Sequence, residues 1–127
     1  MSMTRATKVL VVDDEQAIAV TLAAILEGAG YQTATAFSGL QAIETAAKFR
    51  PNFLLSDIRM PGMNGVEAAI QILGFLPECS VLLISGYVAD DVLAAARTRG
   101  FDFEVCSKPM PPPLLLGKIA EIVSRSH

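Results

Sequence analysis

The sequence predicts an α/β fold: a doubly wound, mostly parallel sheet of five strands with a helix after each strand. Two observations support this. Short apolar runs alternate five times with segments of helical periodicity along the 127 residues. Runs as uniformly apolar as residues 8–12 are typical of strands buried on both faces. No linker or composition shift divides the chain, so we expect one domain over residues 1–127 with right-handed crossovers.

The first three elements follow from local patterns. Residues 8–12 (KVLVV) are predicted as the first strand. Residues 15–29 are predicted as a helix that the glycines at 28 and 30 can end. Its apolar residues at helical spacing are Ile18, Leu22, Ile25 and Leu26. Residues 31–37 (YQTATAF) alternate and contain threonine, which predicts a less buried strand near a sheet edge.

A capping box predicts where the second helix begins. Ser38 precedes Gln41 by three residues, so the two side chains can satisfy free backbone N–H groups at the helix start. Arg50-Pro51 ends this helix. The residues expected to face the core are Leu40, Ile43 and Ala47.

The second half of the chain repeats the alternation. Residues 53–56, 81–84 and 103–106 are predicted as the third, fourth and fifth strands. Asn64 is expected to cap the third helix, which Pro77 closes, and Asp90 to cap a fourth helix running to Gly100. Three prolines at 111–113 lead into a last helix over 114–124, because proline is acceptable only in the first helical turn.

Composition excludes several classes of protein. The net charge of −3 gives no basic surface for nucleic acid, and no apolar stretch approaches the ~20 residues of a membrane helix. The N-terminus has no signal-peptide pattern. Cys79 and Cys106 stand far apart, so we expect small buried side chains rather than metal ligands, in a reducing, cytoplasmic compartment.

Polar residues stand where the predicted strands end. Parallel α/β sheets bind ligands at the carboxyl ends of their strands, so these side chains should meet on one rim. Carboxylates held together repel one another unless a cation intervenes, and Mg²⁺ with oxygen ligands suits them. A lysine and a hydroxyl beside such an ion make a site for a phosphoryl group. The residues are Asp13, Asp14, Asp57, Ser85 and Lys108, with Glu15 next to the first pair.

Each of these residues also has an ordinary structural interpretation. Asp13 and Asp14 could cap a helix, and Asp57 could form an Asx-turn. Ser85 before a glycine and Lys108 before a proline could be turn residues. Their joint appearance at successive strand ends favours a site.

Four motifs resemble the receiver domain of two-component response regulators. They read VLVVDDE, LLSDIRMPGMNG, LLISG and SKP, in the order and spacing of that family, and the resemblance covers essentially the whole chain. It implies a flavodoxin-like sheet in the strand order 2-1-3-4-5 with five helices.

The resemblance also implies roles for particular residues. Asp57 would be the phosphoacceptor, attacking a phosphohistidine on a partner kinase. Asp14 would bind Mg²⁺ directly and Asp13 largely through water, with Asp57 and the backbone carbonyl of Arg59 completing the protein ligands. Pro61, Gly62 and Gly65 would form a rigid loop that turns that carbonyl toward the metal.

The switch residues of the family are matched in part. Ser85 would move its hydroxyl to the phosphoryl group, Lys108 would pair with the same group, and the Lys108–Pro109 bond would be cis. Receivers usually carry Tyr or Phe three residues before the lysine, and Val105 stands there in this chain. Phe103 and Tyr87 are candidates to replace part of that function, although ordinary packing is the simpler interpretation of both.

Arg59 and Tyr87 occupy the two positions that, in this family, tune how fast the phosphoryl group is lost. We hypothesise that an arginine and a bulky ring there shield the acyl phosphate from water. A comparison of phosphate half-lives in Arg59→Asn and Tyr87→Ala tests this, and unchanged lifetimes would reject it.

The resemblance implies partners as well. The phosphoryl donor would be a sensor histidine kinase or a phosphotransfer protein, and the output a contact with a downstream protein or a homodimer through the fourth helix, fifth strand and fifth helix. No direct contact with nucleic acid or membrane is expected. The chain is either a stand-alone receiver or an excised domain. Apolar residues in the expected output elements are Val88, Val92, Leu114 and Leu115.

Three other functions compete with this interpretation. A flavodoxin-like electron carrier needs a hydroxyl- and glycine-rich phosphate loop, and the acidic DDEQ segment would repel a flavin phosphate. A phosphatase with an aspartyl nucleophile would carry a DxD pattern after the first strand. A pseudo-receiver would be a scaffold that binds partners without phosphorylation, and Val105 leaves room for that alternative. If none of these alternatives holds, we expect a phosphoacceptor domain that catalyses only its own phosphorylation and dephosphorylation.

Overall fold

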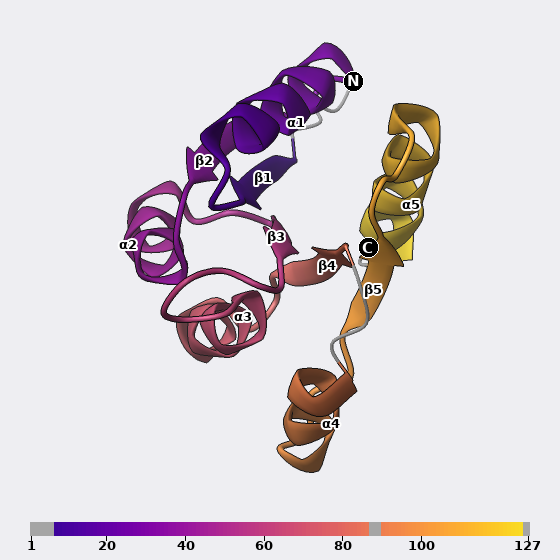
Figure 1. The fold of residues 1–127 in the computed structure, drawn as a ribbon. Coiled ribbons are helices and arrows are strands. Elements are labelled where there is room, and N and C mark those ends of the chain that lie inside the picture. The colour runs from indigo at the N-terminus through magenta and orange to yellow at the C-terminus, as the bar shows by residue number, and fades with distance from the viewer. Residues whose placement is uncertain (1–6, 87–89, 126–127) are drawn as a thin grey trace.

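The computed structural model describes residues 7–86 and 90–125. Within these residues five strands alternate with five helices, as predicted (Figure 1). The strands are β1 (Lys8–Val12), β2 (Gln32–Ala36), β3 (Phe53–Asp57), β4 (Ser80–Ser85) and β5 (Glu104–Ser107). The helices are α1 (Gln16–Gly28), α2 (Gly39–Phe49), α3 (Gly65–Phe75), α4 (Asp90–Thr98) and α5 (Pro112–Arg125).

The strands form one parallel sheet in the order β2-β1-β3-β4-β5. This confirms the flavodoxin-like topology that the resemblance implied. The chain starts in β1, moves outward to β2, and then crosses to β3 on the other side of β1. The strand order therefore reverses between β1 and β3, which is where such sheets bind ligands.

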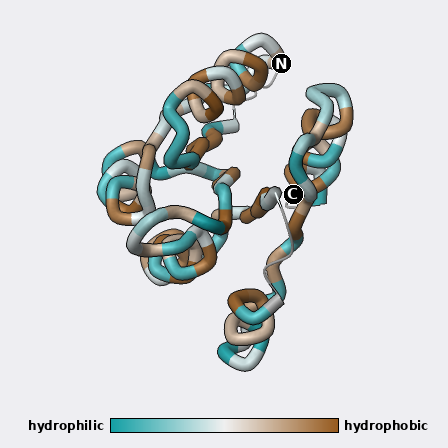
Figure 2. The backbone as a smooth tube through the Cα atoms, in the orientation of Figure 1, coloured by the Kyte–Doolittle hydropathy of each residue, from teal (hydrophilic) through white to brown (hydrophobic). Residues whose placement is uncertain are grey.

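Apolar side chains cover both faces of the sheet. In β1, Val9 and Val11 belong to a core cluster with residues of α1 and α5, whereas Leu10 and Val12 belong to a cluster on the other face with residues of α2 and α3. This double burial explains why the strand sequence is uniformly apolar rather than alternating. Figure 2 shows hydrophobic residues on β1 and β4 and a mixture of hydrophobic and hydrophilic residues along the helices.

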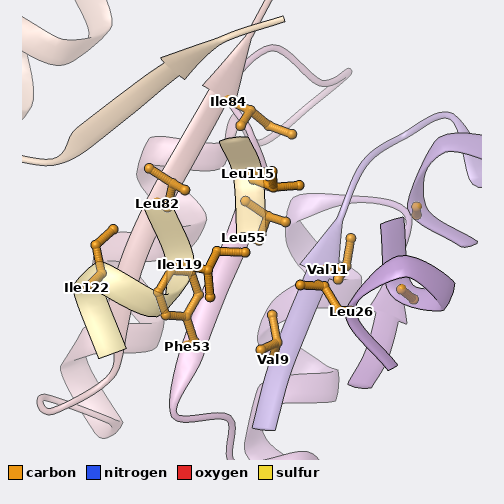
Figure 3. Close-up of a cluster of buried hydrophobic side chains, with 12 residues drawn as sticks. Val9, Val11, Leu26, Phe53, Leu55, Leu82, Ile84, Leu115, Ile119 and Ile122 are labelled. Carbon is orange, nitrogen blue, oxygen red and sulfur yellow. The ribbon is translucent and has the colours of Figure 1, made fainter. Parts of the chain in front are cut away.

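Helix α5 closes one of these faces. Its side chains Leu115, Ile119 and Ile122 lie against residues of β3 and β4, among them Phe53 and Leu82 (Figure 3). The cluster holds the middle of the sheet, so the strand ends near its rim are carried on a rigid support.

The second helix shows that one prediction was wrong. Ser38 caps α2 through the backbone N–H of Gln41, as predicted. Leu40, however, is 62% exposed and Ala47 is exposed, while Ile43 is half-buried. The face turned inward is Gly39, Ala42 and Ala46.

The reason is a close approach at the start of α2. A Cβ atom on Gly39 would lie 2.8 Å from the backbone oxygen of Met63. The helix therefore turns its smallest residues toward the loop after β3 and β1, and the apolar stripe read from sequence is rotated by one residue. Glycine and alanine give a weaker hydrophobic signal in the sequence than leucine, although they form the buried face of α2.

Other boundaries and burial states follow the predictions with small shifts. Asn64 caps α3 through the backbone N–H of Glu67, and α4 ends at Thr98 rather than Gly100. Cys79 is buried, which raises its thiol pKa to about 12, whereas Cys106 is only half-buried because β5 is an edge strand. None of the helices in the described part of the chain is long and apolar enough to span a membrane.

Candidate functional site

Four neighbouring strands deliver polar residues to one rim of the sheet. Asp57 ends β3 and Ser85 ends β4, while Asp13 and Lys108 directly follow β1 and β5. The register brings them together. Val12 pairs with Ser56, which places the next residue of each strand side by side. The backbone N–H of Lys108 donates to the carbonyl of Ser85 at 2.7 Å.

The Lys108 ammonium group lies between two carboxylates. Its Nζ is 3.0 Å from Oδ2 of Asp13 and 3.3 Å from Oδ2 of Asp57. Asp13 is fully buried and Asp57 is 8% exposed. Buried carboxylates are costly unless they are paired, so the lysine is the group that allows both acids to lie inside.

The pKa values of Asp57 and Lys108 are both raised, for different reasons. Burial raises the pKa of Asp57 above its ordinary value, and the nearby Asp13 adds to this, while Lys108 opposes it. Burial acts to lower the pKa of Lys108, but the hydrogen bond from its ammonium to Asp13 and the charges of both acids outweigh it and raise that pKa. Lys108 is therefore a positively charged group at the rim.

A third acid completes a cluster that suits a cation. Oxygen atoms of Asp13, Asp14 and Asp57 lie within 4.8 Å of one another, with Asp14 exposed to solvent. Oδ1 of Asp13 also accepts a hydrogen bond from the backbone N–H of Glu15 at 3.0 Å, which fixes its direction. Three oxygen donors with one open to solvent match the preference of Mg²⁺ for carboxylates and retained waters.

The loop between β3 and α3 runs beside this cluster. Its first residue, Ile58, is buried, and the backbone N–H of Gly65 donates to the Ile58 carbonyl at 2.8 Å. Gly62 adopts a positive φ of 76°, which favours glycine. Met60 packs into the core, and the Arg59 guanidinium lies 3.7 Å from Asp91 of α4.

Two contacts in this region were not predicted from the sequence, although Gly65 itself was expected to form part of the loop. Ser56 is 1% exposed and its hydroxyl donates to the backbone carbonyl of Asp57 at 2.9 Å. Gly65 lies directly against the same carbonyl. A serine inside an apolar strand was the available signal for the first contact, and no sequence signal marks the second.

The position usually held by an aromatic residue is on the surface. Val105 is 39% exposed on β5. Phe103 stacks on Phe101 with ring centroids 5.8 Å apart and packs against the cluster that contains Ile58 and Leu83. This contact agrees with ordinary packing for Phe103, and Tyr87 lies outside the described residues.

The expected output face is only partly exposed. Leu114 is 62% exposed and Leu115 is 1% exposed, so the two neighbours on α5 face solvent and core respectively. Val92 packs against a core cluster. Val88 lies outside the described residues.

The Lys108–Pro109 peptide bond is cis, as the resemblance implied.

Comparison with known proteins agrees with this geometry. The family model for the response regulator receiver domain matches residues 9–120. The chain belongs to the receiver domain family. Receiver domains are phosphoacceptors of two-component signalling, and the acidic rim is the part of the fold where such domains bind Mg²⁺.

Two curated relatives illustrate the similarity. A response regulator receiver protein of Anaeromyxobacter sp. (strain Fw109-5) is 39% identical over 84% of this chain and 44% of its own length. Sporulation initiation phosphotransferase F of Bacillus subtilis (strain 168) is 32% identical over 73% of this chain and 75% of its own length. The chain thus spans less than half of the first relative and most of the second.

Solved structures show the same receiver fold. The receiver domain protein (CheY-like) of Methanospirillum hungatei JF-1 superposes with a TM-score of 0.88 and 27% identity, covering 96% of this chain and 97% of that one. Chemotaxis protein CheY4 of Vibrio cholerae gives a TM-score of 0.84 and 27% identity, covering 93% and 99%.

Proposed function

We propose that residues 1–127 act as a single receiver domain in which the Asp57 carboxylate accepts a phosphoryl group from a sensor histidine kinase or a phosphotransfer protein. The observation that carries the proposal is the position of Asp57. Its carboxylate ends the central strand β3, 3.3 Å from the Lys108 ammonium and within the three-acid cluster. A carboxylate becomes an effective nucleophile when its partner charges and its direction are fixed in advance.

The acid cluster fits the Mg²⁺ ion that receiver domains use. Asp14 would hold it directly and Asp13 largely through water, together with the Asp57 carboxylate and the Arg59 backbone carbonyl. When bound, the ion neutralises charge on the phosphoryl oxygens during transfer. The solvent exposure of Asp14 keeps one side of the cluster open for the ion and its waters.

The chain's own residues then perform defined tasks. An Oδ atom of Asp57 forms a bond to phosphorus while the bond from phosphorus to the donor's imidazole nitrogen breaks, and the electron pair leaves with the imidazole. Lys108 moves from the carboxylates to pair with a phosphoryl oxygen. Ser85, on the adjacent strand end, donates its hydroxyl hydrogen to another. The domain catalyses only its own phosphorylation and the later hydrolysis of the acyl phosphate.

The signal would leave the domain by protein contact in the cytoplasm. Val105 and Leu114 are exposed apolar residues that belong to β5 and α5, two of the three elements of the expected output face of α4, β5 and α5. We propose that this face docks a downstream protein or a second copy of the chain. The name of the Bacillus subtilis relative, a phosphotransferase, agrees with a relay of this kind.

Labelling with acetyl phosphate tests the proposal. The wild-type protein is expected to gain one phosphoryl group only when Mg²⁺ is present, and Asp57→Asn is expected to gain none. Asp102→Asn is the matched control, because Asp102 is exposed and pairs with Arg97 away from the rim. If the folded wild-type protein takes no label, the proposal fails and the phosphorylation-independent scaffold replaces it.

A further inference from the structure

The peptide group that follows Asp57 lies at an unusual point of the sheet. The backbone N–H of Ile58 donates to the carbonyl of Ile84 in β4 at 3.1 Å. Since the C=O and N–H of one peptide plane point in opposite directions, the Asp57 carbonyl points away from β4. It points to the side of β1, whose last register pair with β3 is Val12 with Ser56. The carbonyl therefore lies just past the end of the β1–β3 ladder.

A side chain supplies a hydrogen bond at this point. The hydroxyl of Ser56 donates to the Asp57 carbonyl oxygen at 2.9 Å, and Ser56 is 1% exposed. A buried hydroxyl without a partner is unfavourable, so this bond is strongly preferred in the folded chain. It ties the peptide plane to the side chain that precedes it.

The start of α3 also packs against this peptide group. A Cβ atom on Gly65 would lie 1.9 Å from the Asp57 carbonyl oxygen and 2.9 Å from Oγ of Ser56. The backbone N–H of Gly65 donates to the Ile58 carbonyl at 2.8 Å. Only glycine allows the helix backbone to approach this closely. Two successive carbonyls are thus fixed by Ser56 and Gly65.

We propose that Ser56 and Gly65 are positioning residues for the phosphoacceptor. They hold the plane between Asp57 and Ile58, and this plane sets the direction in which the Asp57 carboxylate leaves the backbone. The same segment leads one residue later to Arg59, whose carbonyl is a proposed metal ligand. The inference rests on the proposed function, because a direction matters only if Asp57 is the attacking group.

Removing the Ser56 hydroxyl tests the first contact. In Ser56→Ala we expect the maximum rate of phosphorylation by acetyl phosphate to fall roughly ten- to a hundredfold, since small misplacements of reacting groups have effects of that size. The half-saturating acetyl phosphate concentration should stay unchanged. Cys79→Ala is the matched control: Cys79 is also buried, and its Sγ contacts the carbonyl of the next residue at 3.5 Å, at the opposite end of the sheet.

Adding a methyl group at Gly65 tests the second contact. Gly65→Ala is expected to lower the maximum rate at least as much as Ser56→Ala, because its Cβ must displace the Asp57 carbonyl. Gly74→Ala is the control in the same helix, since a Cβ there would meet nothing within 4 Å. Rates are compared well below each variant's unfolding temperature, so that loss of stability does not contribute.

A measurement without Mg²⁺ or phosphate gives an independent result. In Ser56→Ala, amide hydrogen exchange at Ile58 and Gly65 should accelerate while exchange in β1 stays unchanged. Wild-type rates and wild-type exchange in Ser56→Ala would overturn the positioning role while leaving the proposed function intact. Absence of labelling on wild-type Asp57 would instead overturn the proposed function. Unchanged exchange at both amides in Ser56→Ala would then show that Ser56 does not hold the peptide after Asp57 either.

Discussion

Strands β3 and β5 each bring one charged residue to the same rim, but they are held in different ways. All five residues of β3 are buried, and the strand pairs with β1 on one side and β4 on the other. β5 is an edge strand of four residues that alternate between half-buried and exposed. The proposed nucleophile therefore stands on the strand whose backbone is fixed from both sides.

Strand β5 is held to α5 by ion pairs between side chains rather than by burial. Glu104 of β5 lies 2.9 Å from the Lys118 ammonium and also bonds to Arg125, both on α5. A hydrogen bond from Lys118, followed by one from Arg125, lowers the pKa of Glu104. Val105, at the usual aromatic position, is exposed on the same strand. The proposed phosphoacceptor is thus held by the core of the sheet, whereas the strand of the proposed output face is held by surface ion pairs.

The largest expected effect is a loss of packing in β3. Phe53 is fully buried among residues of α5 and β4 (Figure 3), so Phe53→Ala should reduce the free energy of unfolding by roughly 4 kcal/mol. Urea denaturation measures this change. A loss below about 1 kcal/mol, the usual effect of an average substitution, would show that β3 is not the more rigid strand.

The next effect concerns the cation at the rim. Lys108→Met leaves Asp13 and Asp57 facing each other without their positive partner, and should reduce the free energy of unfolding by roughly 2 kcal/mol, since Lys108 itself is partly exposed. Lys118→Met is the control, because it removes only a surface ion pair with Glu104 and should cost less stability. Equal losses in the two variants would contradict the distinction between the rim and the β5 surface.

Replacing Asp57 is expected to stabilise the protein at neutral pH, in contrast to the loss of stability expected for Lys108→Met. Burial raises its pKa in the folded protein above the ordinary value of 3.8, so the folded state binds more protons than the unfolded state. The stability from this group is therefore present below pH 3.8 and is lost as pH rises through the raised pKa. In metal-free protein, Asp57→Asn should raise the thermal midpoint at neutral pH and lose that advantage in acid.

The control for this effect is Asp102→Asn, which changes an exposed acid paired with Arg97. Thermal unfolding of both variants over a pH series gives the comparison. A lower midpoint for Asp57→Asn than for the wild-type protein at neutral pH would contradict the assigned cause of the pKa shift.

The smallest effect is expected on the edge strand. Val105 is 39% exposed, so Val105→Ala should change the free energy of unfolding by less than about 0.5 kcal/mol and leave the rate of phosphorylation unchanged. Urea denaturation and acetyl phosphate labelling measure the two quantities. A slower phosphorylation rate in Val105→Ala would mean that the exposed side chains of β5, and not only Lys108 at its end, contribute to the chemistry, which would contradict the distinction between the two strands.

The family resemblance implied the strand order, and the sequence pattern predicted which polar side chains would meet at one rim. Apolar runs predicted the positions of the strands. The rule that parallel strands present their carboxyl ends at one rim then predicted that Asp13, Asp57 and Lys108 lie close together. Both predictions depend on the spacing of apolar residues along the chain and on the topology of parallel sheets, and neither requires knowledge of packing distances.

Close backbone approach was harder to predict. Leu40 was placed inward because a leucine is a strong hydrophobic signal, whereas the helix turns Gly39 and Ala42 to the core. The contact of Gly65 with the Asp57 carbonyl left no signal either, because a glycine has no side chain whose pattern can be read. Packing distances between backbones require the folded chain, and they decide which face of a helix is buried.

The most direct test of the account is to locate the phosphoryl group. After labelling with acetyl phosphate and Mg²⁺, fragment mass spectrometry of the wild-type protein should place a single phosphoryl group on Asp57, with none on Asp13, Asp14 or Ser85. A phosphoryl group found on any of those three residues, or a folded protein that takes none, would contradict the claim that the buried end of β3 carries the chemistry.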